Sequence, residues 1–232
     1  MPSMRLSCES YFIDIIKFDK MSTMIKISTV KIPYNKLLAR LGYLQTKTKL
    51  DDKTANLIKE NLSLAQKLIK PKVVTAFENI TIINDEVLFK KGYKIKSSNI
   101  AMLLKNSFKV YGVGVTIDNV IESKRDGCLK KKEIFNALIF DAAGSVAAEE
   151  TIILAYEQIK TYEENNNNFI TKRYSPGYGD WNLENNREFL DWIGAEHIGI
   201  KLNEFCQMRP EKSISALIGV TKQQSKKGLA QN

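Results

Sequence analysis

The sequence predicts an α+β fold in which helices flank an antiparallel sheet and one long helix is buried at the centre. Helical and strand patterns are interspersed without regular alternation, which favours an antiparallel sheet over a doubly wound parallel one. The stretch 137–148 is apolar nearly all round, as is typical of a helix enclosed by other elements. The last strand pattern places its apolar residues on one face of the sheet: Ile214, Ala216, Ile218 and Val220.

The first elements of the expected domain are short. Thr29–Pro33 has the pattern of a lead-in strand. Tyr34–Leu41 has the pattern of a helix, and Gly42 is placed to close it. We therefore expect the fold to begin close to residue 25.

A helix and two strands are expected next. Asp51 or Asp52 can cap a helix whose apolar residues recur at helical spacing, and Pro71 stops that helix. Lys72–Ile83 and Glu86–Phe89 carry β-branched and aromatic residues around an Asn-Asp turn. This pattern predicts two antiparallel strands.

The middle of the chain contains the strongest patterns. Ser97 or Ser98 can cap a helix over Ile100–Asn106, and Phe108–Ile117 follows as a strand. Lys131–Glu163 is the longest helical pattern in the chain and contains the apolar stretch described above.

The second half of the chain is interrupted at two places. Gly144 and Ser145 lie in the middle of the long helix, where glycine costs about 1 kcal/mol relative to alanine, so we expect another backbone or a ligand to pack closely there. Asn165–Asn168 is expected to form a solvated loop. A short strand into Arg173 and a helix over Asn185–Ile193 follow.

The composition is that of an ordinary soluble globular protein. The chain has 232 residues, of which 44% are hydrophobic and 26% are charged. No apolar run approaches the roughly 18–20 residues that a membrane span needs. We expect a cytoplasmic protein with one domain over residues 25–222, an N-terminal extension over 1–24 and a disordered tail over 223–232.

Charge, cysteine and glycine content limit the classes of function. The net charge is +9, and residues 1–110 hold 20 Lys/Arg against 9 Asp/Glu. Such a half attracts nucleic acid, an anionic cofactor or an acidic protein, although lysines spread along helices also form a solvated face. With three scattered cysteines and one histidine, we expect neither a zinc site nor a disulfide framework, and we interpret His197 as a structural or surface residue. Gly112 and Gly114 indicate a softened strand and not a dinucleotide loop.

The segment RYSPGYGDW, Arg173–Trp181, is the candidate ligand site. Pro176 fixes φ, while Gly177 and Gly179 permit positive φ, so the backbone can turn tightly and present its N–H and C=O groups to a purine edge.

Side chains of the same segment can also stack on a ring of a ligand and pair with its charge. Tyr174 or Tyr178 can stack on a ring, and the planar guanidinium of Arg173 suits a carboxylate. Together these features suit an amphoteric adenosyl ligand. A proline-glycine turn with surface aromatics explains the same residues equally well, and the residues alone leave both interpretations open.

Three stretches resemble the activation (reactivation) domain of cobalamin-dependent methionine synthase, most of all its free-standing members. Arg173–Trp181 resembles the family's R-x-x-P-G-Y segment, which free-standing members read as S-P-G-Y-G-D-W. Met208–Ser215 resembles its M-x-P-x-x-S-x-S segment. Phe140–Ser145, followed by Glu149, resembles its D-A-x-G-S-x-x-x-E stretch. The resemblance covers roughly Ser28 to Lys222.

The resemblance implies a bent antiparallel sheet that binds S-adenosylmethionine. It also implies that the chain is a reactivation subunit, a component of methyltransferase activity in methionine biosynthesis. Its expected partners are a cobalamin-binding methionine synthase or related corrinoid protein, which carries cob(II)alamin, and an electron donor of the flavodoxin or ferredoxin type. Neither nucleic acid nor a membrane is expected as a partner.

The resemblance also implies roles for individual residues. Arg173 would hold the ligand carboxylate, and the backbone of Ser175–Tyr178 would meet the adenosyl group. Glu149 would face the amino group or the sulfonium, since a cation favours a nearby carboxylate. No role is implied for Gly179, Asp180 and Trp181, which depart from the fused enzymes.

Two other functions remain open from the sequence. An independent methyltransferase that uses S-adenosylmethionine would need a group to activate its nucleophile, and Glu149 is the one candidate. A nucleic-acid-binding module is motivated by the basic N-terminal half. It ranks last because the chain has no arginine-rich stretch and no interleaved aromatic platform.

Overall fold

The computed structural model describes residues 22–25, 27, 29–43 and 49–222. The expected tail over 223–232, most of the expected extension over 1–24, and Cys8 lie outside these residues. The described helices are α1 (Tyr34–Arg40), α2 (Asp52–Leu68), α3 (Ser98–Leu104), α4 (Val120–Lys130), α5 (Ile134–Asn165) and α6 (Asn186–Ile193), with two 3₁₀ turns, η1 (Leu183–Asn185) and η2 (Ala195–Ile198). The described strands are β1 (Ser22–Ile25), β2 (Lys72–Ile83), β3 (Glu86–Phe89), β4 (Lys94–Lys96), β5 (Ser107–Thr116), β6 (Phe169–Ile170), β7 (Lys201–Leu202), β8 (Met208–Arg209) and β9 (Ser213–Thr221).

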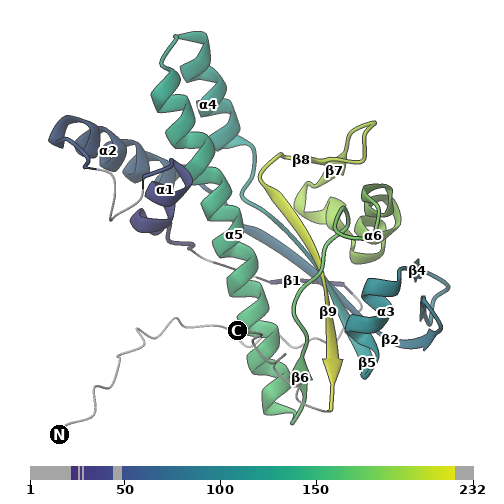
Figure 1. Ribbon diagram of the computed structural model, residues 1–232. Coiled ribbons are helices and arrows are strands. Elements are labelled where there is room, and N and C mark those ends of the chain that lie inside the picture. The colour runs from purple at the N-terminus through teal and green to yellow at the C-terminus, as the bar shows by residue number, and fades with distance from the viewer. Residues whose placement is uncertain (1–21, 26, 28, 44–48, 223–232) are drawn as a thin grey trace, which may run out of the picture.

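Seven strands of the described chain form one antiparallel sheet in the order β4-β3-β2-β5-β9-β6, with β1 paired to β2 (Figure 1). The central pairs are long: β5 pairs with β2 from Lys72↔Thr116 to Asn79↔Lys109, and with β9 along its whole length. Because β6 is only two residues long, most of the outer edge of β9 is left for the segment that follows β6. The predicted α+β class with an antiparallel sheet is confirmed.

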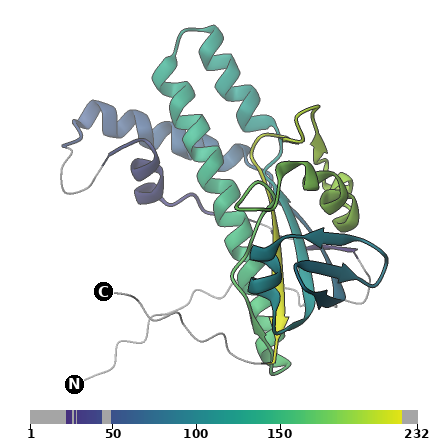
Figure 2. The ribbon, with the colours of Figure 1, turned by 45° about the vertical axis from the view of Figure 1, so that its right-hand side comes forward.

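One face of the sheet is covered by the second half of α5 (Figure 2). The side chains of Ile152, Ala155 and Ile159 form a buried cluster with residues of β5 and β9, among them Val113 and Ile218. Burying an aliphatic side chain of this kind contributes about 1.5–3 kcal/mol, so this cluster fixes the helix against the sheet. The prediction of a long buried helix is confirmed.

The opposite face of the sheet is covered by α3 and α6. Gly112 and Gly114 of β5 face α6, and a Cβ added at Gly112 would lie 2.3 Å from Cζ3 of Trp192 and 2.4 Å from Cγ2 of Ile193. The glycines therefore make room for side chains of a packed helix, which agrees with their interpretation as strand residues.

A third cluster joins α1, α2 and α4 to the first half of α5. It lies beyond the end of the sheet, and the α4–α5 hairpin projects from it in both views (Figures 1 and 2). At Gly144 an added Cβ would lie 2.9 Å from Cγ2 of Ile121 and 3.2 Å from Cγ of Lys212. The close neighbours of this glycine are thus side chains, where the sequence had suggested a backbone or a ligand.

Several predicted element boundaries agree with the structure to within a few residues. The side chain of Asp51 accepts a hydrogen bond from Thr54 N at the start of α2, and Ser97 does the same for Ile100 N at α3. Asn84 adopts a positive φ in the turn between β2 and β3. These features depend on residues close in sequence, which is why the sequence indicated them.

The prediction of a strand over Thr29–Pro33 is wrong. The carboxamide of Gln66 on α2 donates to Val30 O and accepts from Ile32 N, so a side chain bonds the extended backbone in place of a strand. The N-terminal strand is β1, which pairs with β2 and lies across the expected boundary at residue 24.

Two features around α5 differ from the expected pattern. The helix α4 was not anticipated, and residues 131–133 form the turn that separates it from α5. At the other end, Asn168 was expected in a solvated loop but is buried, and its Nδ2 donates to Oε2 of Glu163 at 2.6 Å.

Within the described part of the chain, no helix is long and apolar enough to cross a membrane. Nor do three or more His, Cys, Asp or Glu side chains gather there as a possible metal site. Cys128 and Cys206 are buried free thiols.

Candidate ligand-binding site

The candidate segment follows the outer edge of β9. After β6, Thr171 N donates to Gly219 O at 2.9 Å. Tyr174 and Leu217 then exchange two backbone hydrogen bonds, at 2.9 and 2.7 Å. The segment is therefore held in extended form against a central strand before it turns away from the sheet.

The turn itself is closed by its own backbone. Gly177 N donates to Trp181 O at 2.7 Å, and Trp181 N donates to Tyr178 O at 3.0 Å. Gly177 has a φ of +92°, a conformation that favours glycine. Tyr178 N donates to Ser175 O at 3.3 Å, so the N–H groups of Gly177 and Tyr178 are engaged within the turn. The C=O groups of Pro176 and Gly177 accept no hydrogen bond from the described residues; Pro176 is buried, while Gly177 is exposed, so the C=O of Gly177 is the one that a ligand can reach.

Position 179 favours glycine because of its backbone conformation and its close neighbours. Its φ is +54°, and a Cβ at this position would lie 2.3 Å from the hydroxyl of Tyr174 and 2.5 Å from Nδ2 of Asn99. The Tyr174 hydroxyl also donates to Tyr178 O at 3.2 Å, across the turn. The turn is thus packed against the first turn of α3.

Asp180 and Trp181 anchor the segment to the rest of the fold. Oδ1 of Asp180 accepts from the Ser97 hydroxyl at 2.5 Å, and Oδ2 accepts from Asn99 N at 3.2 Å. The Ser97 hydrogen bond is the main cause that lowers the pKa of Asp180. Trp181 is fully buried and meets Phe189 of α6 edge to face, with ring centroids 5.2 Å apart. The three residues without an expected role therefore fix the turn.

Arg173 and Glu149, the two charged residues of the predicted site, form an ion pair. Nη2 of Arg173 donates to Oε1 of Glu149 on α5. Their side chains remain 33% and 44% exposed, so solvent or a ligand can reach both. The structure brings together the predicted partner of a carboxylate and the predicted partner of a cation.

A cavity of about 350 Å³ lies beside Arg173, between α5 and the edge segment, which is the stretch Thr171–Tyr174 along the outer edge of β9. The residues that line it are Ile153, Tyr156, Glu157, Lys172 and Arg173. The hydroxyl of Tyr156 donates to Thr171 O at 3.0 Å, which fixes the ring against the edge segment. The cavity offers an apolar wall, one acid and two cations to a ligand.

The D-A-A-G-S stretch and the Met208–Ser215 segment meet on the same side of α5. Nζ of Lys212 donates to Oδ1 of Asp141 at 2.7 Å and to the Ser145 hydroxyl at 3.0 Å. Burial opposes ionisation of Asp141, but Lys212 and a nearby arginine outweigh it and hold the pKa of that carboxyl below its usual value. Asp141, Ser145 and Glu149 follow one another at intervals of four residues, so they lie on one face of the helix.

Sequence reasoning did not identify Lys212. The residue falls at a variable position of the family-like segment, and its partners are 67 and 71 positions away, so no local signal could have indicated it.

On the opposite face of the sheet, the Met208–Ser215 segment forms part of a second cavity, of about 550 Å³. Its lining residues are Leu183, Asn186, Gln207, Met208, Arg209, Glu211 and Ser213. The Ser175 hydroxyl donates to Ser215 O at 2.6 Å, which ties the candidate turn to β9.

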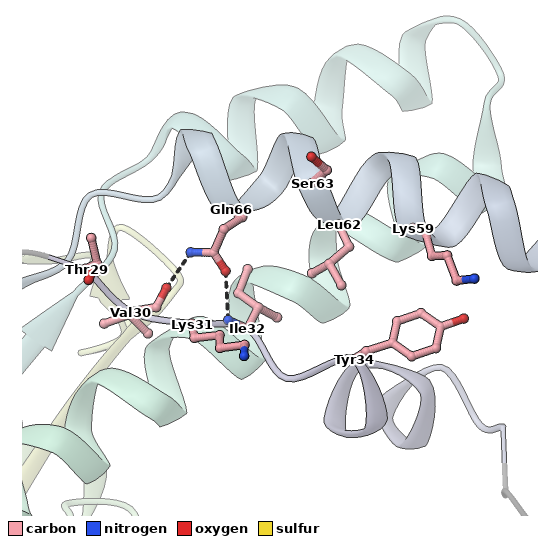
Figure 3. A pocket seen from close by; sticks show the side chains of 9 residues that line it. All are labelled: Thr29, Val30, Lys31, Ile32, Tyr34, Lys59, Leu62, Ser63 and Gln66. Carbon is pink, nitrogen blue, oxygen red and sulfur yellow. Dashed lines mark hydrogen bonds between the residues drawn. The ribbon is translucent and has the colours of Figure 1, made fainter. Parts of the chain in front are cut away.

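A third cavity, of about 490 Å³, lies between α2 and the extended segment that precedes α1 (Figure 3). Gln66 crosses it to reach Val30 and Ile32, and Lys31 and Lys59 are its charged residues. None of the predicted site residues lines it. His197, the single histidine, is exposed in η2 and belongs to none of these cavities.

The fold has a counterpart among solved structures. The chain is similar to a crystal structure of the MetH reactivation domain bound to AdoHcy, with a TM-score of 0.62 and 13% sequence identity. The match covers 91% of this chain and 82% of that one. No protein-family model matches the sequence, and no curated protein matches it. The chain therefore has the fold of that reactivation domain.

Proposed function

We propose that this chain is an S-adenosylmethionine-binding reactivation subunit that supports reductive methylation of cob(II)alamin on a partner methionine synthase or related corrinoid protein. The observation that carries the proposal is spatial convergence. Three separate segments that resemble the family meet at one edge of a sheet, in a chain with the fold of an AdoHcy-bound reactivation domain.

The paired charges suit the amino-acid end of such a ligand. Its carboxylate would replace Glu149 on the guanidinium of Arg173, and its ammonium or sulfonium would take the Glu149 carboxylate. One ion pair would thereby become two, and each would stay partly exposed, as the pair is now.

The adenosyl end would lie along the turn. The C=O group of Gly177 is available to a donor on a purine, and the ring of Tyr178 is 67% exposed and free to stack. Ser175 and Trp181 hold the turn in place through the sheet and the core, so little ordering would accompany binding.

S-adenosylmethionine supplies a methyl group at a sulfonium. In the proposed reaction this group passes to the cobalamin of the partner after a flavodoxin- or ferredoxin-type protein has delivered one electron. The residues of this chain bind and orient the methyl donor, and none of them is required as a general base. That division of labour distinguishes the proposal from an independent methyltransferase.

Calorimetric titration with S-adenosylmethionine and with AdoHcy tests the binding step. Arg173→Ala is expected to weaken AdoHcy binding by about 1.5–3 kcal/mol, or roughly 10- to 150-fold, because a charge-assisted pair is lost. The matched control is Arg187→Ala, which removes an arginine whose one hydrogen bond to the described residues goes to Glu204 O.

A second ligand tests whether the affinity lost in Arg173→Ala comes from the contact with the ligand carboxylate. 5′-Methylthioadenosine lacks the carboxylate, so Arg173→Ala should bind it as well as the unaltered protein does. Equal weakening for both ligands would refute the carboxylate role of Arg173. No binding of either ligand by the unaltered protein would refute the proposed function.

Reactivation itself requires an assay with partners. A synthase whose cobalamin has been oxidised, an electron donor and S-adenosylmethionine should recover methyl transfer only when this chain is added. Recovery that does not depend on this chain would limit the proposal to ligand binding.

A further inference from the structure

The turn between α4 and α5 presents three consecutive lysines, Lys130–Lys132, at the end of the projecting hairpin. All three are exposed, and no ion pair to them is found among the described residues. The acid that follows, Glu133, accepts from Nδ2 of Asn136 at 3.2 Å on its own helix. Glu133 offsets part of the positive charge of this turn, and the net positive charge that remains is not paired within the described chain.

Apolar side chains lie beside the lysines. Leu129 at the end of α4 is 46% exposed, and Ile134 and Leu138 on the first turns of α5 are 63% and 50% exposed. Ile134 and Leu138 are four residues apart, so they form a short ridge along one side of the helix. Exposed aliphatic groups that share a helix face and adjoin unpaired charges are typical of interaction surfaces.

The ridge continues toward the candidate ligand site. At 100° per residue, the positions of Ile134, Leu138, Asp141, Ser145 and Glu149 fall within a sector of about 80° around α5. Along this face Lys212 covers Asp141 and Ser145, and Glu149 with its ion pair to Arg173 lies beyond them. At 1.5 Å per residue, Ile134 and Glu149 are about 22 Å apart.

We propose that the lysine turn Lys130–Lys132, the adjoining Leu129 and the ridge of Ile134 and Leu138 are the docking surface for a protein partner with an acidic surface. Charge complementarity selects the partner, because three unpaired cations attract an acidic surface and steer its approach. The apolar ridge supplies contact area beside the charges.

The arrangement favours a protein over an anionic lipid surface. In a membrane-binding tip, apolar side chains occupy the extremity and cations lie behind them at the headgroups. Here the lysines occupy the extremity, and Leu138 lies a full turn further down the side of α5. A partner that contacts both the lysine turn and the side of α5 as far as Leu138 needs a surface of matching shape, which a folded protein provides and a lipid surface does not.

The experiment uses flavodoxin as an acidic protein probe and follows its binding to the full chain by fluorescence anisotropy. The triple variant K130E/K131E/K132E is expected to weaken binding by about 10- to 100-fold at low ionic strength, since three attractions become repulsions. The double variant I134S/L138S is expected to weaken it by about tenfold while leaving the salt dependence unchanged.

The matched control is K90E/K91E/K94E. It makes the same change of charge in another exposed lysine turn, between β3 and β4, and should bind flavodoxin as the unaltered chain does. Equal weakening by the control would refute the proposal, because the attraction would then reside in net charge alone.

Two further outcomes would also overturn the proposal. One is that flavodoxin fails to bind. The other is that phosphatidylglycerol vesicles bind more tightly than flavodoxin and with the same dependence on Lys130–Lys132. AdoHcy titration of each variant should match the unaltered chain, so loss of docking is distinguishable from loss of the ligand site.

Discussion

Substituting Gly179 by alanine tests how tightly the candidate turn is packed. An alanine at φ +54° carries a left-handed backbone cost of about 1–2 kcal/mol. Its Cβ would also lie 2.3 Å from the Tyr174 hydroxyl and 2.5 Å from Nδ2 of Asn99, so both side chains must move. Displacing them breaks hydrogen bonds worth about 0.5–1.5 kcal/mol each. We expect G179A to lower the free energy of unfolding by about 2–5 kcal/mol.

The measurement is equilibrium unfolding in urea, with G199A as the control. Gly199 has a φ of +86°, and a Cβ there would meet nothing within 4 Å, so its variant carries the backbone cost alone. We expect G179A to cost more than G199A and to weaken AdoHcy binding as well. If the two variants cost the same, the crowding around Gly179 would be relieved by small shifts, and our account of this position would be wrong.

Two further predictions concern buried polar groups. Trp181→Phe should cost about 1–3 kcal/mol in urea unfolding, because it leaves a cavity in the core, although the Nε1 that it removes finds no acceptor among the described residues. Trp192→Phe should in addition lose a hydrogen bond worth about 0.5–1.5 kcal/mol, since Nε1 of Trp192 donates to Glu78 at 3.2 Å. Glu163→Gln should cost about 3 kcal/mol at neutral pH, because it leaves the mostly buried ammonium of Lys109 without its counter-charge.

The pH dependence of Glu163→Gln provides an independent check. Burial opposes ionisation of Glu163, but hydrogen bonds from Lys109, Tyr111 and Asn168 outweigh it and keep its pKa below the usual carboxyl value. A lowered folded pKa contributes stability that is complete above the unfolded pKa and is lost as the pH falls through the folded pKa. The difference between the two proteins should therefore shrink on acidification. A constant difference down to low pH would contradict the assignment.

Elements that depend on nearby residues were predictable. Asp51 and Ser97 cap helices through groups three residues away, and Asn84 turns the chain between two strands. The alternation over Ser213–Thr221 predicted a strand, but not that both of its faces are buried, because the second face depends on α6 and Trp181. The physical cause is the sequence separation of the interacting residues. Interactions between neighbours along the chain can be recognised in the sequence, whereas packing joins segments that are far apart in it.

The candidate site shows the same division. Arg173 and Glu149 were identified from a family resemblance and are brought together by the fold. Lys212 was missed because its partners lie on a helix about seventy positions earlier in the chain. The role of Gln66 was missed for another reason. The extended segment Thr29–Pro33 has a strand-like sequence pattern, but its backbone is bonded by the carboxamide of Gln66 and not by a neighbouring strand.

The length of α5 has a mechanical consequence. Its 32 residues extend about 48 Å, and the same rigid rod carries the exposed lysine turn at one end and Glu149 near its middle. Because the second half of α5 is fixed against the sheet, a tilt of about 5° of the first half, which is about 24 Å long, would displace the hairpin end by roughly 2 Å and leave Glu149 nearly still. A load applied at the hairpin would therefore move the hairpin far more than it moves Glu149. The charged pair lies close to the pivot of this lever, where the geometry of a bound ligand is least disturbed by the motion of a partner.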